Sequence, residues 1–282
     1  MNGKRNRFLH LLSRYPLQAL SMLFLVLMVF LAIFAPYMTI HDPYEQNIFV
    51  RLRPPSSGHW MGMDQLGRDI FARITYGARY SLMIGILASG IGCVLGTTLG
   101  LTCGFFGGRV DSVIMRVVDL MLSFPGVLLA ILLVSVLGPG LDNLIIALAV
   151  WFTPTMARVI RSNVMVIMKQ EYIESARAQG AGAIRIMLRH LLPNCMSPII
   201  VYGTLSVANA LLVAASLSFL GLGIQPPTPE WGAMIGAGRR YLRDGFHVTL
   251  FPGVAIFLTV LALNLIGDAL RDLLDPRLKG QG

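Results

Sequence analysis

Few residues in this chain combine the type and the spacing that chemistry needs. The candidate metal ligands and thiols are His41, His59, His247, Cys93, Cys103 and Cys195. The three histidines lie in separate loops far apart in the sequence, so we expect no shared metal site. Two of the cysteines, ten residues apart in one apolar segment, would lie about 15 Å apart along a helix, beyond disulfide reach. We interpret all three cysteines as small buried side chains.

The motifs of phosphate chemistry and of enzyme catalysis are also missing from the sequence. A phosphate-binding loop needs Gly-x-x-x-x-Gly-Lys-[Ser/Thr] after a strand, whereas the single Gly-Lys pair, Gly3-Lys4, is followed by Arg5. No pair of polar groups stands out as the catalytic residues of a lipid or cell-wall enzyme. We predict that the chain is not an enzyme and binds no cofactor. Any ATP and Mg²⁺ would then be bound by a separate polypeptide.

The composition explains why polar sites are scarce. Of 282 residues, 55% are hydrophobic and 13% charged, and the mean hydropathy is +0.68, whereas about a quarter of a soluble domain is charged. The net charge of +9 would suit nucleic acid only on the basic face of a soluble fold, and no soluble stretch is long enough to present one. The sequence predicts an all-α integral membrane protein that contacts lipid and no nucleic acid.

Six stretches are long and apolar enough to cross a bilayer, for which about 20 residues suffice. They are Tyr15–Ile40, Tyr80–Gly108, Leu120–Leu141, about Gly140–Ile160, about Ser197–Gly221 and Phe251–Gly267. The fourth is the weakest, because it contains Pro154 and needs Arg158 and Arg161 to lie at the headgroups. Residues Val110–Leu122 predict a helix on the cytoplasmic surface that leads into the third span.

The basic residues predict the orientation. The first span is longer than the apolar region of a signal peptide, so we interpret it as an anchor. With the N-terminus inside, inner segments hold fifteen of the 23 Lys and Arg. This bias predicts cytoplasmic N- and C-termini.

The content of the spans bears on the transport class. They lack the buried ionisable residues of proton or ion relays, and no inverted halves are visible. The sequence therefore argues against an ion-coupled secondary transporter, which remains the alternative from another class. Gly92, Gly96 and Gly100 share one face of the second span, and such a face admits a closely packed partner helix from this chain or from another subunit.

The longest inner loop, Arg158 to Leu192, is compatible with helix on both sides of a glycine joint. Residues Met165–Gln179 predict a first helix, which Gly180 interrupts. Residues Ala183–Leu191 predict a second helix, which Pro193 ends. A short rigid element of this kind can transmit force from a motor protein into the attached spans.

This loop resembles a known signature. The stretch EYIESARAQGAGAIRIMLRHLLPN, Glu171–Asn194, is similar to the coupling loop of type I permease subunits of ATP-binding-cassette (ABC) importers. That signature is Glu-Ala-Ala, three residues, Gly, nine residues and Ile-x-Leu-Pro. Matching residues are Glu174, Ala176, Gly180, Leu192 and Pro193. Ser175 and His190 depart from the signature, and the form with His190 is typical of the dipeptide, oligopeptide and nickel branch.

Three further blocks resemble the same branch: His59–Leu82, Ser218–Ile235 and Asn264–Gly280. The resemblance is to the C-type permease. It implies the type I ABC permease fold, with six transmembrane helices, in the bacterial cytoplasmic (inner) membrane. We expect residues 1–79 to form the tail, first span and outer loop, and residues 269–282 a cytoplasmic tail. Residues 80–268 would form the transmembrane core, including a coupling loop at 158–193.

The resemblance implies ATP-driven import of di- or oligopeptides, with nickel, another metal chelate or glutathione-like peptides as alternative cargo. The implied partners are a second related permease subunit, two ATP-binding ATPase subunits and an extracytoplasmic substrate-binding protein. The implied ATPase-coupling residues are Glu174, Ser175, Ala176, Arg177, Gly180, Arg189 and Pro193. Of these, Arg177 and Arg189 would offer charge to the ATPase surface.

A second group of polar residues lies on the predicted outer side. Possible contacts with the binding protein are Asp64, Arg68, Asp69, Glu230 and Trp231. A competing interpretation is that the two tryptophans, Trp60 and Trp231, anchor the chain at the membrane interface. The acidic and basic residues of the first outer loop would then cap helices and pair locally.

Overall fold

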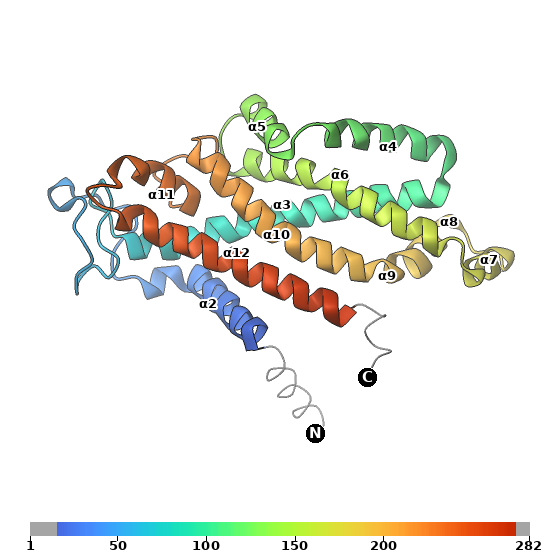
Figure 1. The fold of residues 1–282 in the computed structure, drawn as a ribbon, viewed down its shortest axis with the longest axis horizontal. Helices are drawn as coiled ribbons and strands as arrows, with labels where there is room; N and C mark the ends of the chain where they lie inside the picture. Colours follow the sequence, from blue (N-terminus) through green and yellow to red (C-terminus); the bar gives the residue numbers. More distant parts are fainter. Residues whose placement is uncertain (1–15, 275–282) are drawn as a thin grey trace, which may run out of the picture.

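The computed structural model describes residues 16–274, which form an elongated bundle of helices (Figure 1). The α-helices are α2 (Pro16–Met38), α3 (Ile70–Phe106), α4 (Gly108–Ser123), α5 (Gly126–Leu137), α6 (Leu141–Ile167), α7 (Glu171–Ala178), α8 (Ala183–Ile186), α9 (Leu192–Asn194), α10 (Met196–Phe219), α11 (Trp231–Gly238) and α12 (His247–Leu274). Short helical turns are η1 (Ile48–Val50), η2 (Met187–Leu191) and η3 (Arg239–Tyr241). Within these residues, the one β pairing is an isolated bridge between Met63 and Asp69.

Five helices in the described part of the chain are long and apolar enough to cross a membrane: α2, α3, α6, α10 and α12. They confirm five of the six predicted spans. The weakest prediction, the fourth span, is a continuous 27-residue helix that contains Pro154. Arg158 and Arg161 of this helix form ion pairs with Asp119 and Asp111 of α4, and their predicted position at the headgroups stays a prediction.

The predicted third span, Leu120–Leu141, is wrong as a single helix. The chain there forms α4 and α5, which meet at an angle of 95°. The break lies at Phe124, whose backbone is extended (φ −80°, ψ 139°) because the following Pro125 disfavours helical geometry in the residue before it. The 12 residues of α5 extend only about 18 Å, short of a bilayer core of about 30 Å. The pair counts as a sixth span only if the bent unit is taken as one crossing. The predicted helix at 110–122 is present as α4. It runs alongside α6 and packs on α3 and α6 (Figure 1), and its position on the cytoplasmic surface stays a prediction.

The central helix α3 packs most extensively against α6, through a row of glycines. A Cβ added to Gly92 would lie 2.9 Å from Phe152 Cβ, and one added to Gly96 would lie 2.5 Å from Met156 Cβ. A Cβ on Gly100 would lie 2.6 Å from the carbonyl oxygen of Ala157. The predicted glycine face is therefore confirmed as a close helix contact, and its partner within this chain is α6.

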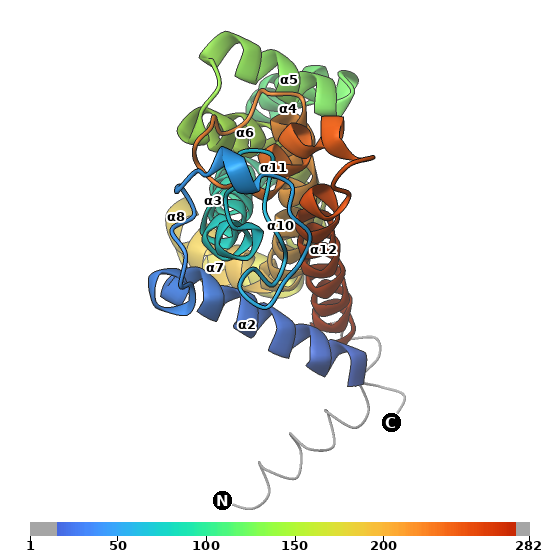
Figure 2. The same cartoon turned by 90° about the vertical axis from the view of Figure 1, so that its left-hand side faces the viewer.

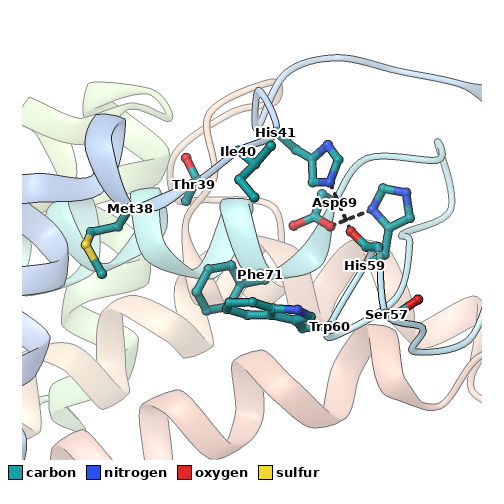
Figure 3. Close-up of a pocket in the computed structure, with 10 residues that line it drawn as sticks. Met38, Thr39, Ile40, His41, Ser57, His59, Trp60, Asp69 and Phe71 are labelled. Atoms are coloured by element: carbon teal, nitrogen blue, oxygen red, sulfur yellow. Dashed lines mark hydrogen bonds and ion pairs between the residues drawn. The ribbon is translucent and has the colours of Figure 1, made fainter.

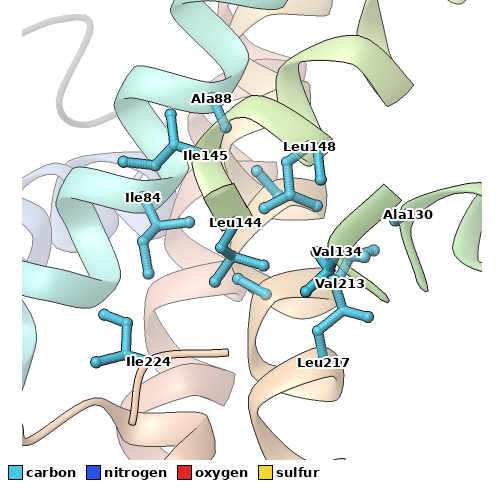
Figure 4. Packing of buried hydrophobic residues seen from close by; sticks show 13 residues of the cluster. Ile84, Ala88, Ala130, Val134, Leu144, Ile145, Leu148, Val213, Leu217 and Ile224 are labelled. Carbon is cyan, nitrogen blue, oxygen red and sulfur yellow. The ribbon is translucent and has the colours of Figure 1, made fainter. Parts of the chain in front are cut away.

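The largest apolar core lies where α3, α5, α6 and α10 meet (Figure 4). Ile84, Leu144 and Leu217 come from three of these helices and are fully buried. Ala130 and Val134, also fully buried, dock the short helix α5 onto this core. The bent segment is thus attached to the bundle by apolar packing.

The two ends of the bundle differ. One end carries the loops between α2 and α3 and between α10 and α12, and Figure 2 looks onto it. The other end carries α7 to α9, and α7 projects beyond the end of α6 (Figure 1). The expected segment boundary at residues 79/80 lies inside α3, whose helix begins at Ile70. The expected tail from residue 269 begins inside α12, and residues 275–282 lie outside the described part.

Candidate functional site

The predicted coupling loop is a short helix held out from the end of the bundle. Helix α7 follows α6 after a turn at Met168–Gln170, so the predicted single helix 165–179 is divided in two. Gln170 is extended (φ −84°, ψ 140°) and starts α7. The predicted second helix corresponds to α8 and η2.

Gly180 ends α7 with left-handed geometry, at φ +79°. The Gly180 amide donates to the Arg177 carbonyl at 2.9 Å, and the Ala181 amide donates to the Ala176 carbonyl at 3.1 Å. These two bonds form a Schellman motif, in which glycine avoids the cost of a side chain at positive φ. The predicted glycine joint is confirmed here: Gly180 fixes the turn between α7 and α8.

Two apolar residues anchor this element to the bundle, and the sequence analysis did not single them out. Ile173 of α7 is fully buried and Ile186 of α8 is 1% exposed. Both belong to one apolar cluster with Ile160 and Val164 of α6 and Leu101 of α3. Isolated isoleucines in a loop rich in charge were the signal that could have revealed them. These two residues therefore pack α7 and α8 directly against two long helices.

The opposite face of the element is open. Exposed or half-buried members of the predicted coupling set are Glu174, Ser175, Ala176, Arg177, Gly180, Arg189 and Pro193. Two large apolar side chains, Ile184 and Leu188, stand four residues apart and are 69% and 58% exposed. The Arg177 side chain is exposed, and its guanidinium lies over the Phe105 ring, 5.7 Å from the centroid. It braces α7 against α3 by a cation–π contact.

Pro193 does not end the second helix, contrary to the prediction. It lies in α9, and the turn before it, η2, is a π-helix in which the Leu192 amide donates to the Met187 carbonyl. A wider turn accommodates a residue that lacks an N–H group. The Asn194 side chain then donates to the His190 carbonyl at 2.6 Å. The chain continues almost unbroken from the coupling element into α10.

A buried ion network organises the opposite end of the molecule. Asp64 accepts from the backbone amides of Leu66 and Arg68 and from the Arg68 Nε at 2.6 Å. The Arg73 Nε lies 3.5 Å from the same carboxylate, while its Nη1 donates to the carbonyls of Pro43 and Pro227. Arg73 thus links three separate stretches of the loops at this end of the bundle.

Glu230 and Trp231 are buried beside this network. Glu230 caps α11, accepting from the amides of Gly232 and Ala233 at 2.9 and 2.8 Å. Burial raises the pKa of Glu230, and the two backbone hydrogen bonds oppose that shift. The Trp231 ring is fully buried, and its Nε1 donates to the Ile74 carbonyl at 3.0 Å. Trp231 is therefore no interfacial anchor.

The five predicted contacts with a binding protein are all at most 4% exposed: Asp64, Arg68, Asp69, Glu230 and Trp231. They cannot present a contact surface in this conformation, which corrects the prediction. Their physical role here is the competing one, local capping and pairing. The most exposed apolar side chain of the same end is Phe49, which is 98% exposed in the η1 turn.

Two of the three histidines that were predicted to share no metal site, His41 and His59, lie side by side (Figure 3). The ring centroids of His41 and His59 are 4.5 Å apart, and His59 Nδ1 lies 2.9 Å from Asp69 Oδ2. His247 is not part of the group, because its Nε2 faces the Met63 carbonyl at 3.2 Å.

A cavity of about 380 Å³ lies between α6 and α10, with a lining that is mostly apolar: Trp151, Phe152, Met156, Tyr202 and Leu205. Thr155, Ser206 and Asn209 form a polar strip on one part of its wall. The Ser206 hydroxyl donates to a carbonyl of its own helix. Asn209 and Thr155 are exposed within spanning helices. Polar groups at this depth are costly against hydrocarbon, so the strip suits water or a polar solute.

Comparisons with known proteins agree with this architecture. Residues 96–280 match the family described as "Binding-protein-dependent transport system inner membrane component", and residues 6–55 match "N-terminal TM domain of oligopeptide transport permease C". The glutathione transport system permease protein GsiD of Pectobacterium atrosepticum is 48% identical over 91% of this chain and 86% of its own. The dipeptide permease DppC of Alkalihalophilus pseudofirmus is 46% identical over 95% and 88%.

Solved structures share the fold. An inward-facing MetNI methionine ABC transporter structure has a TM-score of 0.59 at 20% identity, covering 73% of this chain and 98% of that one. An amino acid ABC transporter crystallised with histidines has a TM-score of 0.56 at 16% identity, covering 72% and 95%. The chain therefore belongs to the inner-membrane permeases of binding-protein-dependent ABC transport systems, and it is a transport subunit and not an enzyme.

Proposed function

We propose that this chain is the C-type permease of an ATP-driven importer of short peptides. It would form the pathway together with a second related permease. The names of its relatives, which refer to dipeptides, di/tripeptides and glutathione, support a peptide of two or three residues as cargo. Glutathione-like peptides fall within the same size class and are the alternative cargo.

The orientation that we propose places α7 to α9 and the end of α12 on the cytoplasmic side. An N-terminal tail inside, as the basic residues favour, puts the loop between α2 and α3 outside. The binding protein would then meet the exposed rim of that loop, around Phe49 and Ile48, which are 98% and 63% exposed. The buried ion network behind this rim would hold it in place.

The observation that carries the proposal is the two-faced coupling element. One face buries Ile173 and Ile186 in a cluster with α3 and α6, and the other exposes Glu174, Ile184 and Leu188. Two ATPase subunits would dock, one on each permease, and closure of the ATPases on ATP would move α7. Because the buried face is packed as tightly as a protein core, that movement would shift α6 and α3 together.

Charge reversal on the open face tests this docking. We expect Glu174→Arg to weaken association with the ATPase about tenfold, equivalent to about 1.4 kcal/mol, because it replaces an exposed acid in the first turn of α7. The measurements are ATPase co-purification and substrate-stimulated ATP hydrolysis in nanodiscs at matched abundance. The control is Asp272→Arg, the same charge change at an exposed position near the end of α12. Wild-type coupling in Glu174→Arg would contradict the docking role.

The proposed pathway follows the polar strip between α6 and α10. The Asn209 side chain is exposed in the middle of α10, and no side-chain hydrogen bond to it is seen within residues 16–274. A peptide carries amide and carboxylate groups that such a side chain can bind. The adjacent aromatic rings of Trp151 and Tyr202 would supply apolar contact area.

We expect Asn209→Leu to reduce peptide uptake about five- to tenfold, the loss of one hydrogen bond of about 1–1.5 kcal/mol. Uptake of labelled dipeptide into proteoliposomes measures it, with ATPase assembly measured in parallel and expected to be unchanged. Asn209→Gln keeps the amide and should restore most of the uptake. Equal uptake by wild type and the leucine variant would place the pathway elsewhere.

A further inference from the structure

The outer end of the protein brings together three side chains of the types that bind transition metals. One ligand atom each from His41, His59 and Asp69 lies within 4.8 Å of the other two. The three residues come from separate segments: His41 follows α2, His59 lies in the loop, and Asp69 caps α3. Figure 3 shows the two rings and the carboxylate pointing toward one another.

The three side chains are held in place by their backbone surroundings. Asp69 Oδ1 accepts from the Ala72 amide at 2.7 Å as the cap of α3, which leaves Oδ2 directed at His59. The His59 backbone exchanges hydrogen bonds with Ser56 in both directions. His41 Nε2 lies 3.0 Å from the Gly58 carbonyl. The cluster is therefore preformed to a large extent, which lowers the cost of binding an ion.

The geometry is close to that of a zinc site with three protein ligands. At Zn–N and Zn–O bonds of about 2.0–2.1 Å, tetrahedral ligand atoms lie about 3.3 Å apart. His59 Nδ1 and Asp69 Oδ2 are 2.9 Å apart, so the distance between these two atoms has to increase by only a few tenths of an ångström to admit an ion. The third ligand atom, no more than 4.8 Å away, can approach by rotation of the His41 ring, which is attached to a loop.

The surroundings leave room for a fourth ligand. The three residues line a cavity of about 380 Å³ whose wall includes Trp60 and Phe71, two rings packed at 5.0 Å. A water molecule can complete the coordination from the cavity side. The donor set of two imidazoles and one carboxylate is borderline in softness, which suits Zn²⁺ better than Mg²⁺ or Ca²⁺.

We propose that His41, His59 and Asp69 form a binding site for a divalent transition-metal ion, best matched by Zn²⁺. The ion fastens the end of α2 to the start of α3. This site lies at the opposite end of the bundle from α7 and outside the polar strip between α6 and α10, and it does not depend on which solute is carried.

Zinc titration of the purified full chain in nanodiscs, against a chromophoric chelator, tests the site. We expect one high-affinity Zn²⁺ per wild-type chain and a loss of affinity of more than about 100-fold in His41→Ala, since removal of an outer-shell partner alone costs 10–100-fold. His41 is the residue of choice because its one side-chain bond is to the Gly58 carbonyl, whereas Asp69 also caps a spanning helix. His59→Ala should have the same effect.

Cobalt absorption and thermal melting provide two further tests of the metal site. Co²⁺ should give the absorption of a tetrahedral complex in the wild type and not in His41→Ala. Zn²⁺ should raise the melting temperature of the wild type and not that of His41→Ala. The control is His190→Ala, a histidine in η2 at the opposite end, which should bind zinc as the wild type does. Absence of saturable binding to the wild type, or equal affinity in His41→Ala, would overturn the proposal.

Discussion

Gly96→Val is expected to destabilise the folded chain by about 3 kcal/mol, at the upper end of the range for overpacked cores. A Cβ at this position would lie 2.5 Å from Met156 Cβ and 2.8 Å from the Thr153 carbonyl oxygen. Neither atom can rotate away, because one is fixed to the backbone of α6 and the other belongs to it. The two helices would have to separate by about 1 Å along their whole contact, which loosens the neighbouring glycine contacts as well.

The matched control is Gly90→Val on the same helix. A Cβ there has no heavy atom within 4 Å, and the residue is exposed on the bundle surface. Both variants gain the same side chain, so the difference between them measures the helix contact alone. We expect the melting midpoint of the detergent-purified chain to fall strongly for Gly96→Val and to stay within a few degrees for Gly90→Val. Similar midpoints would show that the α3–α6 contact is loose.

The bundle could be predicted from the sequence because a membrane restricts the options. Stretches without charge must be helical where they contact lipid, and such stretches located α2, α3, α10 and α12. The span at α6 could be predicted only by placing Arg158 and Arg161 at the headgroups. The glycine face of α3 was predictable for the same reason, since small residues repeat at helical spacing. The partner of that face was not, because spacing on one helix carries no information about which helix lies opposite.

The break between α4 and α5 shows where a count of apolar residues fails. The window 120–141 contains no charged residue, yet Pro125 forces Phe124 out of helical geometry. Pro193 was predicted to end a helix, but the wider π-helical turn η2 before it accommodates the proline and the helix continues. The local chemistry of proline is the same at both sites. The surrounding packing decides whether the chain bends or forms a wider turn.

The polar residues at the outer end were hardest to place. Charged side chains in a loop are usually exposed, so Asp64, Arg68 and Glu230 were predicted as contact residues, whereas the structure buries them with mutual partners. The meeting of His41 and His59 had no signal in the sequence either. Their contact depends on how the loop between α2 and α3 folds back, which is a tertiary property.

Asp64→Ala is expected to open the outer loop, at a cost of about 3–5 kcal/mol. The carboxylate is 3% exposed and lies between Arg68 and Arg73, each 4% exposed. Its removal leaves two buried guanidinium groups without their counter-charge, and the same residue also accepts from the amides of Leu66 and Arg68. A buried pair is little screened by salt, so the effect should persist at high ionic strength.

Trypsin offers a local readout of that opening. Arg51 is exposed, but the stretch that follows it is held by two backbone bonds, from the Leu52 amide to the Asp64 carbonyl and from the Met63 amide to the Arg53 carbonyl. Cleavage of the Arg51–Leu52 bond therefore requires the loop to open, and a loss of 3–5 kcal/mol raises the open population about 100-fold or more. The control Asp42→Ala removes an exposed carboxylate that accepts only from the Tyr44 amide, at 2.8 Å, and should change the rate less than about fivefold.

Equal cleavage rates for Asp64→Ala and wild type would mean that the loop is held by apolar packing around Ile70 and Trp231, with the ion network contributing little. Faster trypsin cleavage of Asp64→Ala, with the rate of the control unchanged, would show that the ion network holds together the loops next to α2, α3 and α11.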